Sequence, residues 1–235
     1  MDLKDKNVII TGGSLGIGKA TANNLIAKGA NVLATGRSLD RLNSAYKNSN
    51  VKVVDFDIGD LDNIQVNAER CINLIGGKID VLINNAGLGV RNSIEELNKE
   101  DFLKVFNVNV FGLALFTKEI VPLMKQQNQG TIINIGSTAS LKGYRNGSVY
   151  ASSKFAVRCL TQCWQAELRP YNIRVSQINP SEVTTAFGNP HRKERKEISN
   201  KLSSQEIAHA IVSSIEMREK GFINELNIWA TNPFD

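Results

Sequence analysis

The sequence has few of the residues that build metal sites and disulfide frameworks. It contains three cysteines (Cys71, Cys159 and Cys163) and two histidines (His191 and His209) in 235 residues. The cysteine spacing matches no zinc motif, and an odd number of cysteines is expected for reduced thiols in a cytoplasmic protein. The histidines are too few and misplaced for a metal centre. We therefore predict a cytoplasmic protein with no bound metal.

Long apolar runs are also missing. No stretch approaches the roughly 18 apolar residues that a membrane-spanning helix needs. The charged N-terminus MDLKDKN leads directly into the apolar VII, without the pattern of a signal peptide. A hydrophobic fraction of 42% and a charged fraction of 22% are those of a soluble globular protein. The length fits a single α/β domain, residues 1–235, with no membrane partner.

Positive charge is in mild excess, with a formal net charge of +5. Much of it lies in the segment HRKERK at 191–196. No aromatic residues interleave with these basic residues, as a single-stranded nucleic-acid platform would require, so we expect no nucleic-acid partner. The segment is either a solvated face or a docking patch for an anionic partner, and the sequence leaves both open.

Short apolar segments alternate with longer amphipathic ones along the chain. We predict strands at 7–11, 31–36, 51–57, 78–87 (a strand followed by a turn), 131–137, 173–180 and 225–230. Most are continuously apolar at their centres, as strands covered on both faces are. A long helix is predicted over 99–125, with Pro122 near its end. This order predicts a single Rossmann-type α/β domain, with a doubly wound, mostly parallel seven-stranded sheet and binding sites at the carboxyl ends of the strands.

The first strand ends in a glycine-rich loop, TGGSLGIGKA. Gly12, Gly16 and Gly18 allow a tight turn, a close approach to a phosphate and the start of a helix whose N-terminus faces that anion. A triphosphate-binding loop is disfavoured, because Ala20 stands where such a loop needs a hydroxyl for magnesium. A methyltransferase would usually place an acid after the second strand, where this chain has Arg37.

Arg37 indicates which nicotinamide cofactor binds. A carboxylate at this position would bind a free ribose 2′-hydroxyl, whereas an arginine pairs with a 2′-phosphate. Ser14 can add a hydroxyl donor to the same phosphate. We therefore expect NADP(H) to be preferred over NAD(H). After the third strand, Asp57 lies where a carboxylate can accept from the adenine amino group, and the small residues of NNAG follow the fourth strand.

Tyr150 and Lys154 lie four residues apart in the helical stretch YASSK. This spacing places them one turn apart on the same helix face. An isolated pair of this kind is often structural. It is also the arrangement in which an ammonium group stands beside a phenol and makes its proton available.

Several motifs together resemble the classical single-domain subtype of the short-chain dehydrogenase/reductase family, including its 3-oxoacyl-carrier-protein reductases. TGGSLGIG matches its T-G-x-x-x-G-x-G, NNAG its N-N-A-G and YASSK its Y-x-x-x-K. Ser137 precedes Tyr150 by thirteen residues at the end of a strand, and Asn109 matches the family asparagine on the long helix. The resemblance covers nearly the whole chain.

The resemblance implies a catalytic set of Asn109, Ser137, Tyr150 and Lys154. Tyr150 would protonate the substrate oxygen as hydride leaves the nicotinamide, and Ser137 would donate a hydrogen bond to that oxygen. Lys154 would lower the pKa of Tyr150 and hold ribose hydroxyls, and Asn109 would position a water that links Lys154 to solvent. The expected cofactor-binding residues are Gly12, Ser14, Leu15, Gly16, Ile17, Gly18, Arg37, Asp57, Ile58, Asn85, Ala86, Gly87, Tyr150, Lys154, Pro180, Val183 and Thr185.

The loop after the sixth strand matches the family less closely. In NPSEVTTAF, Pro180, Val183 and Thr185 match the family's P-G-x-V-x-T, but Ser181 replaces its glycine. Val183 would then lie against the nicotinamide amide and Thr185 could bond to it. The serine puts the backbone geometry of this loop in question.

The substrate is less well defined than the reaction. The segment from Ala186 to about Leu202 is short where the family carries its substrate lid, and the C-terminus lacks the glycine-rich tail common in bacterial 3-oxoacyl-carrier-protein reductases. We expect an NADPH-dependent reductase of ketones, aldehydes or 3-oxoacyl thioesters, with HRKERK as a hypothetical dock for an acyl carrier. The alternative is a non-catalytic NADP-binding regulator. The resemblance also implies a homo-oligomer, a tetramer or a dimer, formed by the long helix and the Tyr150 helix.

Overall fold

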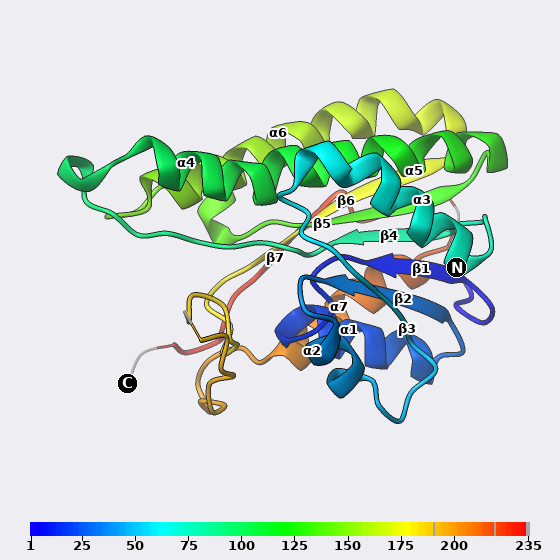
Figure 1. Ribbon diagram of the computed structural model, residues 1–235, viewed down its shortest axis with the longest axis horizontal. Coiled ribbons are helices and arrows are strands. Elements are labelled where there is room, and N and C mark those ends of the chain that lie inside the picture. The colour runs from blue at the N-terminus through cyan, green and yellow to red at the C-terminus, as the bar shows by residue number, and fades with distance from the viewer. Residues whose placement is uncertain (190, 219, 234–235) are drawn as a thin grey trace.

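The chain folds around one seven-stranded sheet, and the computed structural model describes residues 1–189, 191–218 and 220–233 (Figure 1). The strands are β1 (Asn7–Ile10), β2 (Asn31–Gly36), β3 (Lys52–Asp55), β4 (Val81–Asn84), β5 (Gly130–Ile135), β6 (Ile173–Pro180) and β7 (Glu225–Ile228). Their order across the sheet is β3-β2-β1-β4-β5-β6-β7, and every pairing is parallel. The predicted doubly wound sheet is confirmed, and it is wholly parallel.

Helices cover both faces of this sheet (Figure 1). One layer contains α1 (Gly16–Ala27), α2 (Leu39–Ala45) and α7 (Ser204–Glu216). The other contains α3 (Ile64–Ile75), α4 (Lys99–Phe106), α5 (Leu113–Gln127) and α6 (Ser148–Leu168). The parallel strands are therefore buried on both sides, which explains why they read as apolar runs in the sequence.

Two apolar cores result, one on each face. In β1, Val8 and Ile10 belong to the core under α1 and α7, whereas Ile9 belongs to the core under α3 and α5. This alternation follows from the two-residue period of a strand. Leu25 of α1 and Phe116 of α5 are both fully buried, one in each core.

The long helix predicted over 99–125 is continuous in space, but it is not α-helical throughout. A six-residue π-helical segment, Asn107–Gly112, joins α4 to α5. π-Helical turns hold one more residue than α turns and are frequent at functional sites. Within this segment Gly112 packs against the loop that follows β3. A Cβ atom on Gly112 would lie 1.9 Å from the Ile58 carbonyl oxygen.

The combined helix Lys99–Gln127 is also long and apolar enough to meet the criterion for a membrane span. Half of its most apolar stretch is buried inside the protein. Phe116, Ile120 and Met124 contribute this apolar character and belong to the core against the sheet. Packing of a core helix therefore accounts for its composition.

The order of the strands places a crevice at the carboxyl ends of β1 and β4. The chain runs from β1 outward to β3 on one side and from β4 to β7 on the other. Ligands of doubly wound sheets bind where the direction of winding reverses, because neighbouring loops separate there. The loops after β1, β4, β5 and β6 all contribute to this region.

Candidate active site

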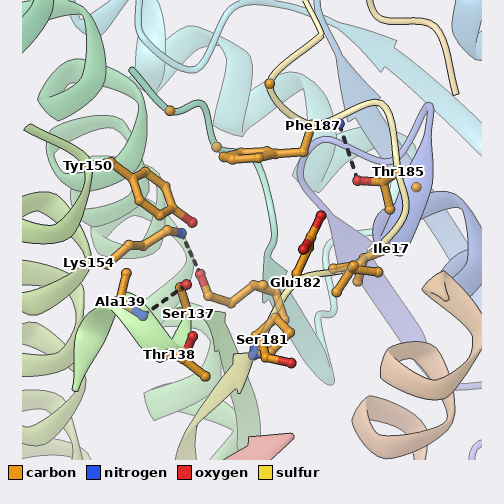
Figure 2. A pocket seen from close by; sticks show the side chains of 18 of the residues that line it. Ile17, Ser137, Thr138, Ala139, Tyr150, Lys154, Ser181, Glu182, Thr185 and Phe187 are labelled. Atoms are coloured by element: carbon orange, nitrogen blue, oxygen red, sulfur yellow. Dashed lines mark hydrogen bonds between the residues drawn. The ribbon is translucent and has the colours of Figure 1, made fainter. Parts of the chain in front are cut away.

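A cavity of about 1170 Å³ opens at this edge of the sheet. Its lining includes residues from four strand ends and from α6: Gly12, Leu15, Gly16, Ile17, Asn85, Ala86, Gly87, Ser137, Tyr150, Lys154, Pro180, Val183 and Thr185. Figure 2 shows Ser137, Tyr150 and Lys154 on one side of the cavity and Ile17 and Thr185 on the other. The volume is large for a small-molecule site and suits a cofactor together with a substrate.

The glycine-rich loop is held against the loop after β4. Gly12 has a left-handed backbone (φ 65°), and a Cβ atom there would lie 2.8 Å from the Ala86 Cα. The Asn85 side chain donates to the Thr11 and Gly12 carbonyls, each at 3.0 Å. These contacts hold the two backbones close together, which only a residue without a Cβ atom allows at Gly12.

The loop leads into the N-terminus of α1, where the structure holds a carboxylate. The Gly16 N–H donates to Glu194 at 2.7 Å, and the other oxygen of the same carboxylate accepts from the Ala186 N–H at 2.8 Å. Helix N-termini favour anions because their first N–H groups have no partner within the helix. An acidic side chain therefore occupies a position that would also attract a phosphate.

Six expected site residues lie outside the described lining of the cavity: Ser14, Gly18, Arg37, Asp57, Ile58 and Asn109. Gly18 is a packing residue, since a Cβ there would lie 2.5 Å from the Gly12 carbonyl oxygen. Ile58 is buried in the core with Phe116, so its side chain is not part of the cavity wall.

Arg37 and Asp57 face each other beside the cavity. The closest guanidinium nitrogen lies 3.8 Å from the Asp57 carboxylate, and the two side chains are 55% and 44% exposed. Asp57 also accepts from the Gly59 N–H at 2.9 Å. An exposed ion pair at this distance contributes at most about 1 kcal/mol, so a phosphate can compete for Arg37. The Ser14 hydroxyl lies 3.5 Å from the position that a Cβ atom on Gly36 would take. Gly36 directly precedes Arg37, so the Ser14 hydroxyl lies near the start of the Arg37 residue.

Ser137 is positioned by its own backbone at the end of β5. Its N–H donates to the Asn179 side chain at 3.1 Å and to the Ser140 hydroxyl at 3.2 Å. Its hydroxyl oxygen accepts from the Ala139 N–H at 3.1 Å. Because the oxygen accepts this bond, the hydroxyl proton remains available for donation into the cavity.

Tyr150 enters the same side of the cavity from α6. Its ring lies 5.6 Å from that of Phe187, in a tilted arrangement. Burial raises the pKa of Tyr150 to about 12, while a hydrogen bond with Ser137 acts in the opposite direction. The phenol therefore keeps its proton at neutral pH, and it can act as an acid.

Lys154 lies beneath Tyr150 and is 5% exposed. Its ammonium group donates to the Ile135 carbonyl at 2.8 Å and lies 5.8 Å from the centre of the Tyr150 ring. Burial lowers the pKa of Lys154 to about 8, so the charged form still predominates at pH 7. The sequence expectation that Lys154 lowers the pKa of Tyr150 stays a prediction: in this structure burial is the largest influence on that pKa, and the hydrogen bond with Ser137 opposes it.

Asn109 is fully buried in the π-helical segment and ties it to the loop after β4. Its side chain donates to the Leu88 carbonyl and accepts from the Leu88 N–H, both at 2.9 Å. It also donates to the Ser153 hydroxyl at 3.0 Å. A Cβ on Gly87 would be 3.4 Å from Asn109 Oδ1 and 3.7 Å from Lys154 Nζ, so both side chains approach the same point.

The loop after β6 tolerates the serine that replaces the family glycine. Ser181 is not among the described residues with a left-handed backbone, so a side chain causes no strain there. Its N–H donates to the Ile228 carbonyl at 2.8 Å, which continues the pairing with β7. The backbone geometry that the sequence put in question is therefore regular.

The basic segment 191–196 is only partly a solvated face. Arg195 bonds to the carbonyls of Thr185 and Val183 and to the Glu182 carboxylate, while Arg192 lines the cavity. With Glu194 at the N-terminus of α1, three of the six residues face the site. Sequence reasoning missed this, as it missed Asn179 and Phe187, because no local pattern reports which distant loop folds over a cavity.

Comparison with known proteins agrees with this geometry. Residues 6–196 match the family model described as short chain dehydrogenase. An uncharacterized oxidoreductase of Staphylococcus epidermidis is 31% identical over 234 residues, covering 96% of this chain and 97% of that protein.

Solved structures give the same result. An alcohol dehydrogenase from Thermococcus sibiricus, complexed with 5-hydroxy-NADP, superposes with a TM-score of 0.89 at 27% identity, covering 97% of both chains. The closed form of serine dehydrogenase complexed with NADP+ has a TM-score of 0.85 at 28% identity, covering 94% of both chains. The chain thus belongs to the short-chain dehydrogenase family and is an oxidoreductase.

Proposed function

We propose that the protein is an NADPH-dependent reductase that converts a carbonyl group to an alcohol. The observation that supports this most strongly is the meeting of Ser137, Tyr150 and Lys154 in one large cavity, with Tyr150 protonated at neutral pH. A phenol that is protonated at neutral pH can give a proton to an oxygen that becomes negative during reduction.

The cavity residues fit a dinucleotide on structural grounds. The backbone cradle at Gly12 leaves no room for a Cβ, and the N-terminus of α1 already holds an anionic group. When bound, the nicotinamide cofactor supplies the hydride. The residues proposed to hold it are those of the glycine-rich loop, the loop after β4 and the loop after β6, with Pro180, Val183 and Thr185 beside the nicotinamide.

The proposed roles of Tyr150 and Ser137 follow from the hydroxyl protons that these side chains can donate. Tyr150 donates its proton to the substrate oxygen, and Ser137 donates its hydroxyl proton to the same oxygen where charge develops. Lys154 brings positive charge to the site and holds ribose hydroxyls. Asn109 lies beside Lys154 and is proposed to position a water that replaces the proton used by Tyr150.

Preference for NADPH is proposed to depend on Arg37. Replacing Arg37 by alanine should weaken NADPH binding by about 10- to 100-fold, because a charge-assisted bond to the 2′-phosphate is lost. NADH affinity should change little, since NADH carries no phosphate there. Fluorescence titration of both cofactors measures this, with Lys47→Ala as an exposed control. An unchanged ratio of the two affinities would contradict the role of Arg37.

The substrate class can be tested with the purified protein. We expect NADPH consumption with an acetoacetyl thioester or with a panel of small ketones and aldehydes. Binding of NADPH without turnover of any of these would favour the alternative, a regulator that binds NADP. Docking of an acyl carrier stays a hypothesis of the sequence, since three of the six residues that suggested it face the cavity.

A homo-oligomer is proposed from the outer surface of the helical layer that contains α4, α5 and α6 (Figure 1). Large apolar side chains are exposed there: Leu103, Phe111, Leu115 and Phe155, at 37–46% exposure. Exposed apolar groups gathered on neighbouring helices are typical of subunit contacts. Sedimentation or light scattering would distinguish a dimer from a tetramer.

A further inference from the structure

Arg192 lines the cavity, and none of the proposed catalytic roles involves it. It lies on the segment that follows β6 and contributes to the same cavity as Gly16 and Ile17. Its Nε is buried and has no hydrogen-bond partner among the residues that the structure describes. A buried donor without a partner is costly, which suggests that a ligand satisfies it.

The surroundings of Arg192 are rich in positive charge. Burial lowers the pKa of Arg192, and so do the nearby guanidinium groups of Arg37 and Arg41, whereas Glu194 acts in the opposite direction. Glu194 is the acid that acts on Arg192, and Asp57 lies 3.8 Å from the Arg37 guanidinium. The guanidinium groups of Arg37 and Arg41 repel that of Arg192, and a bound dianion would relieve this repulsion.

We propose that Arg192 is a specificity-determining residue that binds the 2′-phosphate of NADPH together with Arg37. Arg37 approaches from the end of β2, and Arg192 approaches from the segment that covers the cavity after β6. Two guanidinium groups from different elements can each donate to the phosphate oxygens. This inference rests on the proposed use of NADPH.

The test compares two ligands that differ only by this phosphate, 2′,5′-ADP and AMP, by calorimetry on the full chain. Arg192→Ala should weaken the binding of 2′,5′-ADP by about tenfold and leave the affinity for AMP unchanged, because one charge-assisted contact with the phosphate is removed. Lys193→Ala is the matched control, since Lys193 is the exposed neighbour in the same segment. Arg192→Lys should restore part of the lost affinity.

The outcomes separate this inference from the proposed function. If the unaltered protein binds both ligands equally, the preference for NADP fails and this inference fails with it. If the protein binds 2′,5′-ADP more tightly than AMP, and this difference depends on Arg37 but not on Arg192, only this inference fails. An equal loss of affinity for both ligands in Arg192→Ala would also overturn this inference, because that result indicates a structural role for Arg192.

A second inference rests on a different contact, the pair of hydrogen bonds from the Gly16 and Ala186 N–H groups to Glu194. We infer that Glu194 is a built-in competitor of the cofactor's pyrophosphate at the N-terminus of α1. Its carboxylate satisfies the donor there and repels a second anion. The carboxylate of Glu194 must therefore leave the Gly16 N–H when the pyrophosphate binds there.

Removing this charge should make the cofactor bind more tightly. Glu194→Gln keeps the size of the side chain, and we expect NADPH and NADH affinities to rise by the same factor, about three- to tenfold, because both carry the pyrophosphate. Glu197→Gln, an exposed acid three residues on, is the control. Unchanged or weaker binding of both cofactors in Glu194→Gln would overturn the competition and assign Glu194 to anchoring the segment instead.

Discussion

Replacement of Tyr150 by phenylalanine is expected to lower the turnover of carbonyl reduction by about 10²- to 10⁴-fold, the usual contribution of a positioned acid. The change removes one hydroxyl group and leaves the ring packed against Phe187. NADPH affinity should therefore stay nearly the same. Steady-state kinetics with NADPH give the turnover, and fluorescence titration gives the affinity.

The control for this variant is Tyr171→Phe, which removes a hydroxyl from a tyrosine that is 39% exposed and not part of the cavity lining that the structure describes. It should retain full turnover. If Tyr150→Phe reduces substrate at the rate of the unaltered protein, Tyr150 is not the acid. A matching loss of thermal stability would instead point to a packing role for its hydroxyl group.

Substitution of Gly112 by alanine is expected to destabilise the protein by about 3 kcal/mol, the upper part of the range for overpacked sites. The added Cβ would meet the Ile58 carbonyl oxygen at 1.9 Å, and a backbone atom cannot rotate away as a flexible side chain can. Urea denaturation measures the change in the free energy of unfolding. The melting temperature should fall by roughly 6–12 °C for a domain of this size.

Gly221→Ala provides the comparison, because no atom of the residues that the structure describes packs within 4 Å of its added Cβ, and its backbone is not left-handed. Its effect on stability should be within about 0.5 kcal/mol. A loss below about 1 kcal/mol in Gly112→Ala would show that the π-helical segment yields easily.

The strands were largely predictable. β2 and β6 occupy the predicted ranges 31–36 and 173–180, because strands buried on both faces read as apolar runs. β3 is shorter than its predicted range of 51–57. Its apolar pattern continues after the pairing with β2 ends at Asp55, and pairing with a neighbour defines a strand.

The long helix shows a different limit. Its apolar stripe predicted one helix over 99–125, and the chain is helical there without a break. The π-helical turn at Asn107–Gly112 is set by contacts with distant residues, namely the bonds from Asn109 to Leu88 and the approach of Gly112 to Ile58. Periodicity along a helix carries no record of such contacts.

The sequence by itself determined the family and the parallel sheet, and it proposed the residues that would carry the chemistry. The motifs depend on spacing within one loop or one helix, and the sheet on the alternation of apolar and amphipathic segments. Tyr150 and Lys154 share a face because they are four residues apart, and the glycines stand where a backbone must turn. Only the tertiary structure decided what surrounds them. It placed Glu194 on the Gly16 N–H, 178 residues away in the chain, and it raised the pKa of Tyr150 through burial. Burial and contact between distant segments arise from the packing of the whole chain, so no short stretch of sequence contains them.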